Sequence, residues 1–233
     1  MDSVLYEILK QAEESWWYRG RTAAVQAHLR KINIPTGEVL DIGAGFGAMH
    51  PLLSKYGPVT AYEIQSDCLE ACRKRGYANV IGHQDELFSP KVPYTLIGAF
   101  DVIEHIEDDL GFLIKIRKAM SDQAYLVATV PAFQFLWSQF DVKNHHFRRY
   151  TKSSFSDLLK NSGFEILRIS YWNSLLFFPA AVMRLFGMAG KDALSPKPIV
   201  NKLLTGIVSF ESRLQSFISL PLGLSLVVVA SPK

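Results

Sequence analysis

The chain of 233 residues is 48% apolar and 20% charged, and 25 Lys and Arg against 22 Asp and Glu give a formal net charge of +3. These values are typical of a globular domain and exclude a largely disordered or fibrous chain. The length suits one domain over residues 1–233, and so small a positive charge does not by itself indicate a nucleic-acid binder.

The N-terminal segment, residues 1–34, is predicted to be helical. Apolar residues recur at helical spacing from Val4 to Ala12, and a second helical stretch ends near Leu29, before the break at Pro35. No basic segment followed by an apolar stretch opens the chain, and the later apolar runs are well short of the ~20 residues that a spanning helix needs. We therefore expect a cytoplasmic protein that is not integral to a membrane.

From residue 38 onward, short apolar strands alternate with helical patterns. The predicted helices include residues 65–75 and 108–119. The predicted strands cover residues 38–42, 59–63, 79–81, 96–101, 125–130, 164–170 and 224–229. This alternation is typical of βαβ units, and it indicates an α/β fold built on a mainly parallel sheet.

One connection, residues 172–221, lacks strand character although it joins the last two predicted strands. Its first half is rich in Phe, a Lys/Pro break follows at residues 195–198, and a helical pattern covers residues 199–218. A structureless loop of this length is unusual inside a compact domain. We therefore predict a helical insertion before the last strand.

A glycine-rich turn follows the first predicted strand. Gly43, Gly45 and Gly47 stand at alternate positions, which permits positive φ angles and lets a bound nucleoside approach the backbone closely. Glu63 ends the next strand, twenty residues after Gly43. A carboxylate at that place can accept hydrogen bonds from both ribose hydroxyls. The turn therefore predicts a nucleoside-binding site.

Two ligand classes fit this turn. Gly43, Gly45 and Ala48 satisfy the dinucleotide spacing, so an NAD(P)-dependent oxidoreductase is one alternative. Asp41, two residues before the first glycine, would repel a pyrophosphate but attract a ligand ammonium group, which favours S-adenosyl-L-methionine. A non-catalytic protein that keeps only the cofactor pocket is a further alternative.

The chain resembles the class I S-adenosylmethionine-dependent methyltransferases of small-molecule type. The resemblance rests on residues 41–47, on Glu63 and on residues 100–106, which read Phe-Asp-Val-Ile-Glu-His-Ile. It implies S-adenosyl-L-methionine as the cofactor. It also implies a Rossmann-like, seven-stranded, mostly parallel sheet with an antiparallel last strand, here with N-terminal helices and the helical insertion added.

The resemblance also implies roles for individual residues. Glu63 would hold the ribose hydroxyls, Ile64 would lie against the adenine, and Asp85 would face the exocyclic amine of the adenine. Asp101 would sit at the end of the fourth strand, and Arg21 would pair with the ligand carboxylate. The methionine and ribose side would be held by Asp41, Gly43, Ala44, Gly45 and Gly47.

Two histidines are candidate general bases for methyl transfer to oxygen. His105 follows the fourth strand, and His146 lies in a loop after the fifth, where the acceptor is expected to enter. Histidine titrates near neutral pH, which suits removal of a hydroxyl proton. The Asn/Asp-Pro-Pro-aromatic tetrad used for base amines is missing, because residues 101–104 read Asp-Val-Ile-Glu.

The same residues also raise the question of a metal ion. Asp101, Glu104 and His105 would share one face of a helical turn, and His146 could supply a fourth ligand. Such oxygen and imidazole donors suit Mg²⁺ or Mn²⁺. The set is similar to that of small-RNA terminal 2′-O-methyltransferases and of some quinone O-methyltransferases. The sequence leaves metal binding open.

The acceptor is expected to be a small molecule, a lipid-linked compound or a glycan. The insertion over residues 172–221 is apolar with basic neighbours, so it is a candidate lid over the methyl donor. Residues 174–220 are also a candidate peripheral membrane contact. The default interpretation of their apolar side chains is simple packing in the core. The basic residues of segment 143–152 suit an anionic acceptor, but the chain lacks the basic and aromatic stripe typical of nucleic-acid binding.

Overall fold

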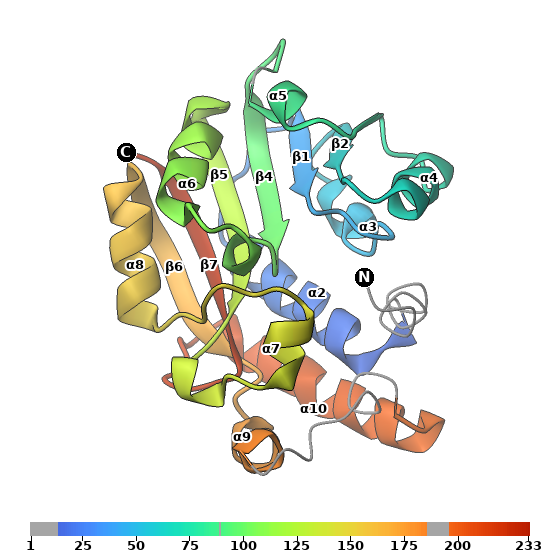
Figure 1. Ribbon diagram of the computed structural model, residues 1–233, viewed down its shortest axis with the longest axis vertical. Helices are drawn as coiled ribbons and strands as arrows, with labels where there is room; N and C mark the ends of the chain where they lie inside the picture. The colour runs from blue at the N-terminus through green and yellow to red at the C-terminus, as the bar shows by residue number, and fades with distance from the viewer. Residues whose placement is uncertain (1–13, 89, 186–195) are drawn as a thin grey trace.

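The computed structural model describes residues 14–88, 90–185 and 196–233, and it contains a seven-stranded sheet with the order β3-β2-β1-β4-β5-β7-β6 (Figure 1). The strands are β1 (Val39–Ile42), β2 (Val59–Tyr62), β3 (Asn79–Ile81), β4 (Tyr94–Phe100), β5 (Met120–Pro131), β6 (Phe164–Trp172) and β7 (Ser225–Pro232). The helical residues predicted between Val4 and Ala12 lie outside the described residues.

The sheet confirms the predicted fold class. Strands β1 to β5 pair in parallel, whereas β7 lies antiparallel between β5 and β6. The main difference concerns β5, which begins at Met120, five residues before the predicted start. Met120 pairs with Tyr94, and a register shift follows before Leu96, so an irregular start on both strands hides the apolar pattern there.

Helices cover both faces of the sheet. The described helices are α2 (Trp16–Leu29), α3 (His50–Leu53), α4 (Ser66–Lys74), α5 (Gln84–Leu87), α6 (Asp109–Lys118), α7 (Gln139–Lys143), α8 (Lys152–Asn161), α9 (Phe177–Leu185) and α10 (Pro198–Gln215). Two short 3₁₀ turns are η2 (Ile103–His105) and η3 (Gln134–Leu136). Among the described helices, none is long and apolar enough to cross a lipid bilayer.

The strand alternation divides the core into two layers. In β1, Leu40 and Ile42 belong to the layer under α6 and α8, whereas Val39 belongs to the layer under α2, α3 and α4. Because successive side chains of a strand point to opposite faces, Asp41 shares the face of Val39. This places its carboxylate under the glycine turn, on the side of α3.

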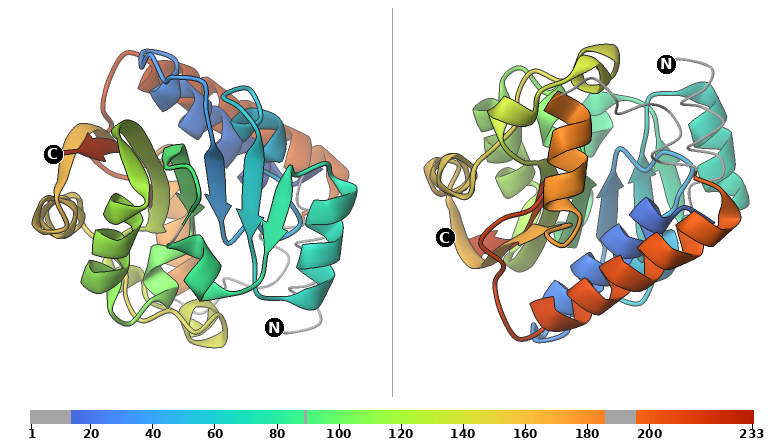
Figure 2. Two further views of the ribbon diagram at one scale, coloured as in Figure 1. Left: turned by 90° about the horizontal axis from the view of Figure 1, so that it is seen from above. Right: turned by 90° about the horizontal axis from the view of Figure 1, so that it is seen from below.

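The predicted helical insertion is present as α9 and α10 between β6 and β7. Figure 2 shows α10 lying alongside α2 on one face of the sheet. The two helices approach closely at Gly20, where an added Cβ would lie 2.6 Å from Cγ2 of Val208. Helix α10 therefore packs mainly against the N-terminal helix.

Candidate functional site

The glycine turn after β1 has the backbone that its sequence predicts. Gly43, Gly45 and Gly47 have φ angles of +65°, +55° and +80°. A Cβ at Gly43 would lie 2.6 Å from Val102, whereas one at Gly45 would meet no atom within 4 Å. The turn thus requires glycine for its conformation, and the space beside Gly45 is open to a ligand.

Glu63 connects this turn to the end of β2. Its Oε2 accepts a hydrogen bond from the amide of Gly45 at 2.8 Å, and its Oε1 accepts from the amides of Ile64 and Gln65 at 2.7 and 3.0 Å. The residue is 8% exposed, and the neighbouring Ile64 is 71% exposed. A carboxylate offers about four acceptor positions, so Glu63 keeps capacity for a ligand hydroxyl.

Asp41 lies deeper than its position before the glycines suggests. It is 1% exposed, and the hydroxyl of Tyr77 donates a 2.6 Å hydrogen bond to its Oδ2. Burial raises the pKa of Asp41 to about 7, against the lowering effects of the Tyr77 hydrogen bond and of Arg21. Its ionisation therefore falls near neutral pH, whereas the sequence alone predicts a fully charged group.

Arg21 reaches the site from α2 and binds the end of β4. Its Nη1 donates a 2.9 Å hydrogen bond to Oδ2 of Asp101, while Oδ1 of Asp101 accepts from the Thr129 hydroxyl at 3.0 Å. Asp101 has a φ angle of +58°, which turns the chain out of the strand. The Nε of Arg21 is buried and has no hydrogen-bond partner among the described residues. Asp85 lies in α5, and its side chain is outside the described residues.

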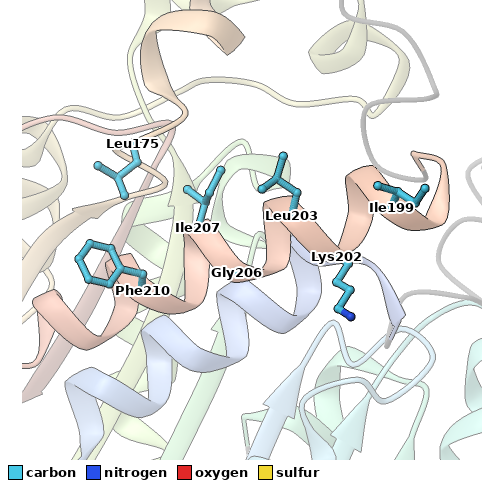
Figure 3. Close-up of a pocket in the computed structure, with 7 residues that line it drawn as sticks. All are labelled: Leu175, Ile199, Lys202, Leu203, Gly206, Ile207 and Phe210. Carbon is cyan, nitrogen blue, oxygen red and sulfur yellow. The ribbon is translucent and has the colours of Figure 1, made fainter.

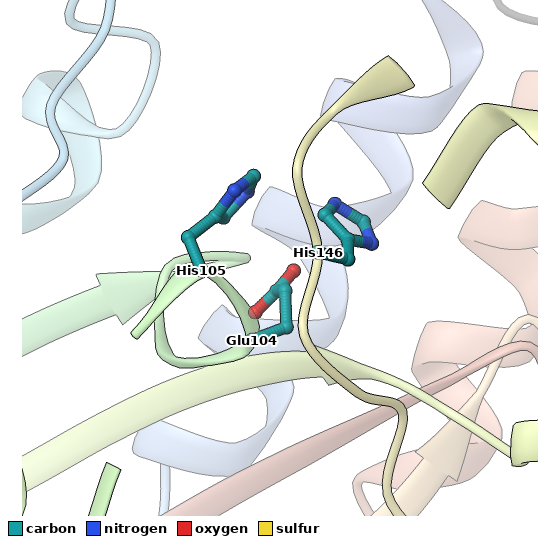
Figure 4. A group of neighbouring side chains, drawn as sticks. All are labelled: Glu104, His105 and His146. Carbon is teal, nitrogen blue, oxygen red and sulfur yellow. The ribbon is translucent and has the colours of Figure 1, made fainter. Parts of the chain in front are cut away.

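Glu104, His105 and His146 come together beside this edge of the sheet. Their potential ligand atoms all lie within 4.8 Å of one another (Figure 4). Asp101 stays apart from this group, because Arg21 and Thr129 hold its carboxylate. The four residues suggested by sequence spacing therefore divide into a cluster of three and a separate ion pair.

The electrostatics of this cluster are unusual. Glu104 is fully buried, and neither of its carboxylate oxygens has a hydrogen-bond partner among the described residues. Burial, and the nearby charge of Asp101, raise the pKa of Glu104 well above its ordinary value. Burial of the ring, with His146 beside it, lowers the pKa of His105 to about 4. His105 is therefore neutral near pH 7, and the environment of Glu104 disfavours its charged form.

Asp141 is the residue that the sequence analysis missed. One carboxylate oxygen, Oδ1, lies 2.9 Å from Nδ1 of His146, and both oxygens accept hydrogen bonds from Arg149, at 2.8 and 3.0 Å. Burial alone would raise the pKa of Asp141, but these hydrogen bonds outweigh it and hold the pKa well below its usual range. The available signal was the capping box that Ser138 and Asp141 form at the start of α7.

The basic loop before α8 is less open to an acceptor than predicted. Arg149 is 7% exposed, and its guanidinium donates hydrogen bonds to Asp141 and to the carbonyl of Ala132. Arg148 pairs with Asp109 at 2.9 Å and donates to the carbonyl of Glu107. Both arginines therefore stabilise the loop that carries His146.

Solved structures share this fold at low sequence identity. An S-adenosylmethionine-dependent methyltransferase from Archaeoglobus fulgidus has 16% identity and a TM-score of 0.60, over 91% of this chain and 94% of that chain. A Leishmania major methyltransferase of this type has 15% identity and a TM-score of 0.59, over 92% and 72% of the chains. A TehB-like methyltransferase from Corynebacterium glutamicum has 16% identity and a TM-score of 0.53, over 91% and 88%.

A family model identifies the family of the chain as well as its fold. No curated protein sequence matches the chain. The family model described as a methyltransferase domain matches residues 16–169, which include the glycine turn, Glu63 and the histidine cluster. This match does not favour the NAD(P)-dependent oxidoreductase or the non-catalytic binding protein. The chain belongs to the methyltransferase-domain family, and it is an S-adenosylmethionine-dependent methyltransferase.

Proposed function

We propose that the enzyme methylates an oxygen of its acceptor and that His146 removes the hydroxyl proton. The observation that carries this proposal is the contact between Nδ1 of His146 and the buried Asp141. A carboxylate at Nδ1 favours the tautomer with the proton on Nδ1, which leaves the lone pair of Nε2 free to accept a proton. The same carboxylate stabilises the imidazolium that forms.

The residues around the glycine turn fit the cofactor. Open space beside Gly45, the remaining acceptor capacity of Glu63 and the exposed side chain of Ile64 suit a nucleoside. The unpartnered Nε of Arg21 suits the carboxylate of the methionine part, and an ionised Asp41 suits its ammonium group. We keep Ala44, Gly43, Gly47, Asp85 and Asp101 in the cofactor set, as the family motif implies.

When bound, S-adenosylmethionine supplies a methyl group activated by the sulfonium, and the thioether S-adenosylhomocysteine is the leaving group. The task of the chain is to align the acceptor oxygen with that methyl group and to take up its proton. Nε2 of His146 accepts this proton in our proposal. His105, whose ring lies 4.5 Å from that of His146, stays neutral near pH 7 and is the secondary candidate base.

The surroundings of His146 support an acceptor with an apolar part. Phe140 and Phe147 lie close to it in the chain and are 38% and 49% exposed, and the ring of Phe140 lies 6.2 Å from that of His146. Because Arg148 and Arg149 are paired internally, the structure lends less support to an anionic group than the sequence did. We therefore favour a hydroxylated small molecule or lipid-linked compound over a glycan.

His146→Gln tests the assignment. Labelled methyl transfer from S-adenosylmethionine into small phenols and lipid extracts is expected to fall by about 10²–10⁴-fold, as typical for loss of a general base. Binding of S-adenosylhomocysteine, measured by calorimetry, is expected to remain unchanged. His145→Gln, at the exposed neighbouring position, is the matched control. Full activity in His146→Gln would refute the base assignment.

A metal-assisted version of this reaction is the second candidate. The unpartnered carboxylate of Glu104 favours it, because an ion bound with His105 and His146 would give that buried group a partner. A bound Mg²⁺ or Mn²⁺ would lower the pKa of the acceptor hydroxyl, and Asp141 would orient His146 from behind. Dialysis against EDTA decides between the two versions. Turnover that EDTA abolishes, and that added metal restores in the wild-type enzyme but not in Glu104→Gln, supports the ion. Undiminished turnover after dialysis excludes it.

A further inference from the structure

Helix α10 presents an apolar face to solvent. Ile199, Leu203, Phe210 and Phe217 (two residues beyond the helix) are 86%, 64%, 56% and 81% exposed, and their spacing keeps them along one side. The opposite side packs against α2 and buries Val208 together with three polar residues, Glu211, Ser212 and Gln215. This distribution reverses the usual one, in which polar residues face water.

The turn before α9 enlarges this apolar face. In Figure 3, Leu203 and Ile207 project from α10 on the side away from α2, and Leu175 lies beside Ile207, above Phe210. These side chains line a groove of about 770 Å³. Oε2 of Glu211 accepts hydrogen bonds from the amides of Ser174 and Leu175, at 2.8 and 2.9 Å. The buried carboxylate therefore holds the turn against α10, and the apolar side chains form one continuous surface.

The charges beside this surface are positive. Lys197, Lys202 and Arg213 are exposed, whereas Glu211, the single carboxylate within the described residues 174–185 and 196–220, is fully buried. A second copy of the chain docked through the same face would bring like charges together, which is unfavourable. A surface that offers negative charge and an apolar layer complements both features.

We propose that the apolar face formed by α10 and the turn before α9 is a docking surface for a bilayer containing anionic lipids. The apolar side chains would enter the boundary between head groups and acyl chains, while the lysines and the arginine would meet the lipid phosphates. Helix α10 contacts α2 at Gly20 and through the Trp16 amide, which donates to Asn201, and α2 carries Arg21 into the cofactor site. Docking would thus bring the methyl-transfer site close to the membrane, which goes beyond the proposed reaction and does not depend on it.

Sedimentation with lipid vesicles tests this surface. The wild-type protein is expected to bind phosphatidylcholine vesicles that contain phosphatidylglycerol at least about tenfold more tightly than vesicles of phosphatidylcholine alone. Leu203→Glu and Phe210→Glu are each expected to weaken binding by about tenfold or more, because an apolar side chain no longer leaves water. Val92→Glu, at a 59% exposed apolar residue before β4, is the matched control and is expected to have no effect.

The charge contribution has its own pair of variants. Lys197→Glu with Lys202→Glu is expected to weaken binding by about tenfold or more, whereas Lys118→Glu with Lys160→Glu makes the same charge change elsewhere and is expected to have less effect. No binding by the wild-type protein, or equal losses in the control variants, would refute the proposal. So would a wild-type dimer that Phe210→Glu dissociates, without vesicle binding. Labelled methyl transfer without vesicles, followed in parallel, reports the proposed function separately, and unchanged binding of S-adenosylhomocysteine shows that the variants are folded.

Discussion

The buried carboxylates of the glycine turn and of the histidine cluster differ in their hydrogen-bond partners. Around the glycine turn, Glu63 accepts hydrogen bonds from three backbone amides, and Asp41 accepts one from the Tyr77 hydroxyl. In the histidine cluster, Glu104 is as deeply buried but has no partner among the described residues, whereas the nearby Asp141 has several. The glycine turn is therefore held in place by its own hydrogen bonds, whereas the histidine cluster keeps one buried carboxyl group without a partner among the described residues.

The largest effect is expected on stability at Asp141. Asp141→Ala leaves the buried Arg149 without its partner, and loss of one member of a buried ion pair typically costs about 3–5 kcal/mol. Urea denaturation measures the free energy of unfolding. Asp157→Ala, at an exposed position of α8, is the control and is expected to change it by less than about 0.5 kcal/mol. A loss of similar size in both variants would contradict the role given to Asp141.

The next effect concerns the cofactor half. Glu63→Ala removes a charged acceptor from the turn, and hydrogen bonds to charged groups contribute about 1.5–3 kcal/mol, so S-adenosylhomocysteine is expected to bind about tenfold to a hundredfold more weakly. Calorimetric titration gives the dissociation constant. Glu70→Ala, whose residue lies on α4 and pairs with Lys74 in solvent, is the control. Unchanged affinity in Glu63→Ala would remove Glu63 from the binding site.

Replacing Glu104 is expected to raise the free energy of unfolding, whereas replacing Asp141 lowers it. Glu104→Leu replaces an unsatisfied buried carboxyl group, and we expect the free energy of unfolding to rise by about 1–2 kcal/mol. Denaturation in the presence of EDTA measures this gain without a bound ion. A marked loss of stability would show that Glu104 has a partner in solution, and the histidine cluster would then not differ from the glycine turn in this respect.

The smallest effect is a pH dependence of cofactor binding at Asp41. Its pKa of about 7 means that the carboxylate becomes charged as the pH rises from 6 to 8. A ligand ammonium group binds the charged form better, so affinity for S-adenosylhomocysteine is expected to increase by up to about tenfold over this range. In the absence of ligand the sign is reversed: the unfolded chain releases this proton near the ordinary pKa of 3.8, so stability falls as the pH rises from there to about 7 and then levels off. Asp41→Asn is expected to flatten both profiles, and an unchanged slope would exclude Asp41 as their cause.

Local features made the sheet and the glycine turn predictable. The apolar strands, the alternate glycines and the position of Glu63 are all visible in short stretches of sequence, since strand periodicity and glycine conformation are local properties. The family resemblance followed from the same stretches. The start of β5 differed from the prediction because Met120 pairs with Tyr94 just before a register shift between β4 and β5.

The amino-acid sequence alone determined the α/β architecture, the glycine turn and the methyltransferase family. Only the tertiary structure decided which polar groups meet: Asp141 with His146 and Arg149, and Arg21 with Asp101. These partners come from irregular loops or lie far apart along the chain, where no periodic pattern relates them. The outward apolar face of α10 was decided in the same way, because packing on α2 selects which side of an amphipathic helix is buried.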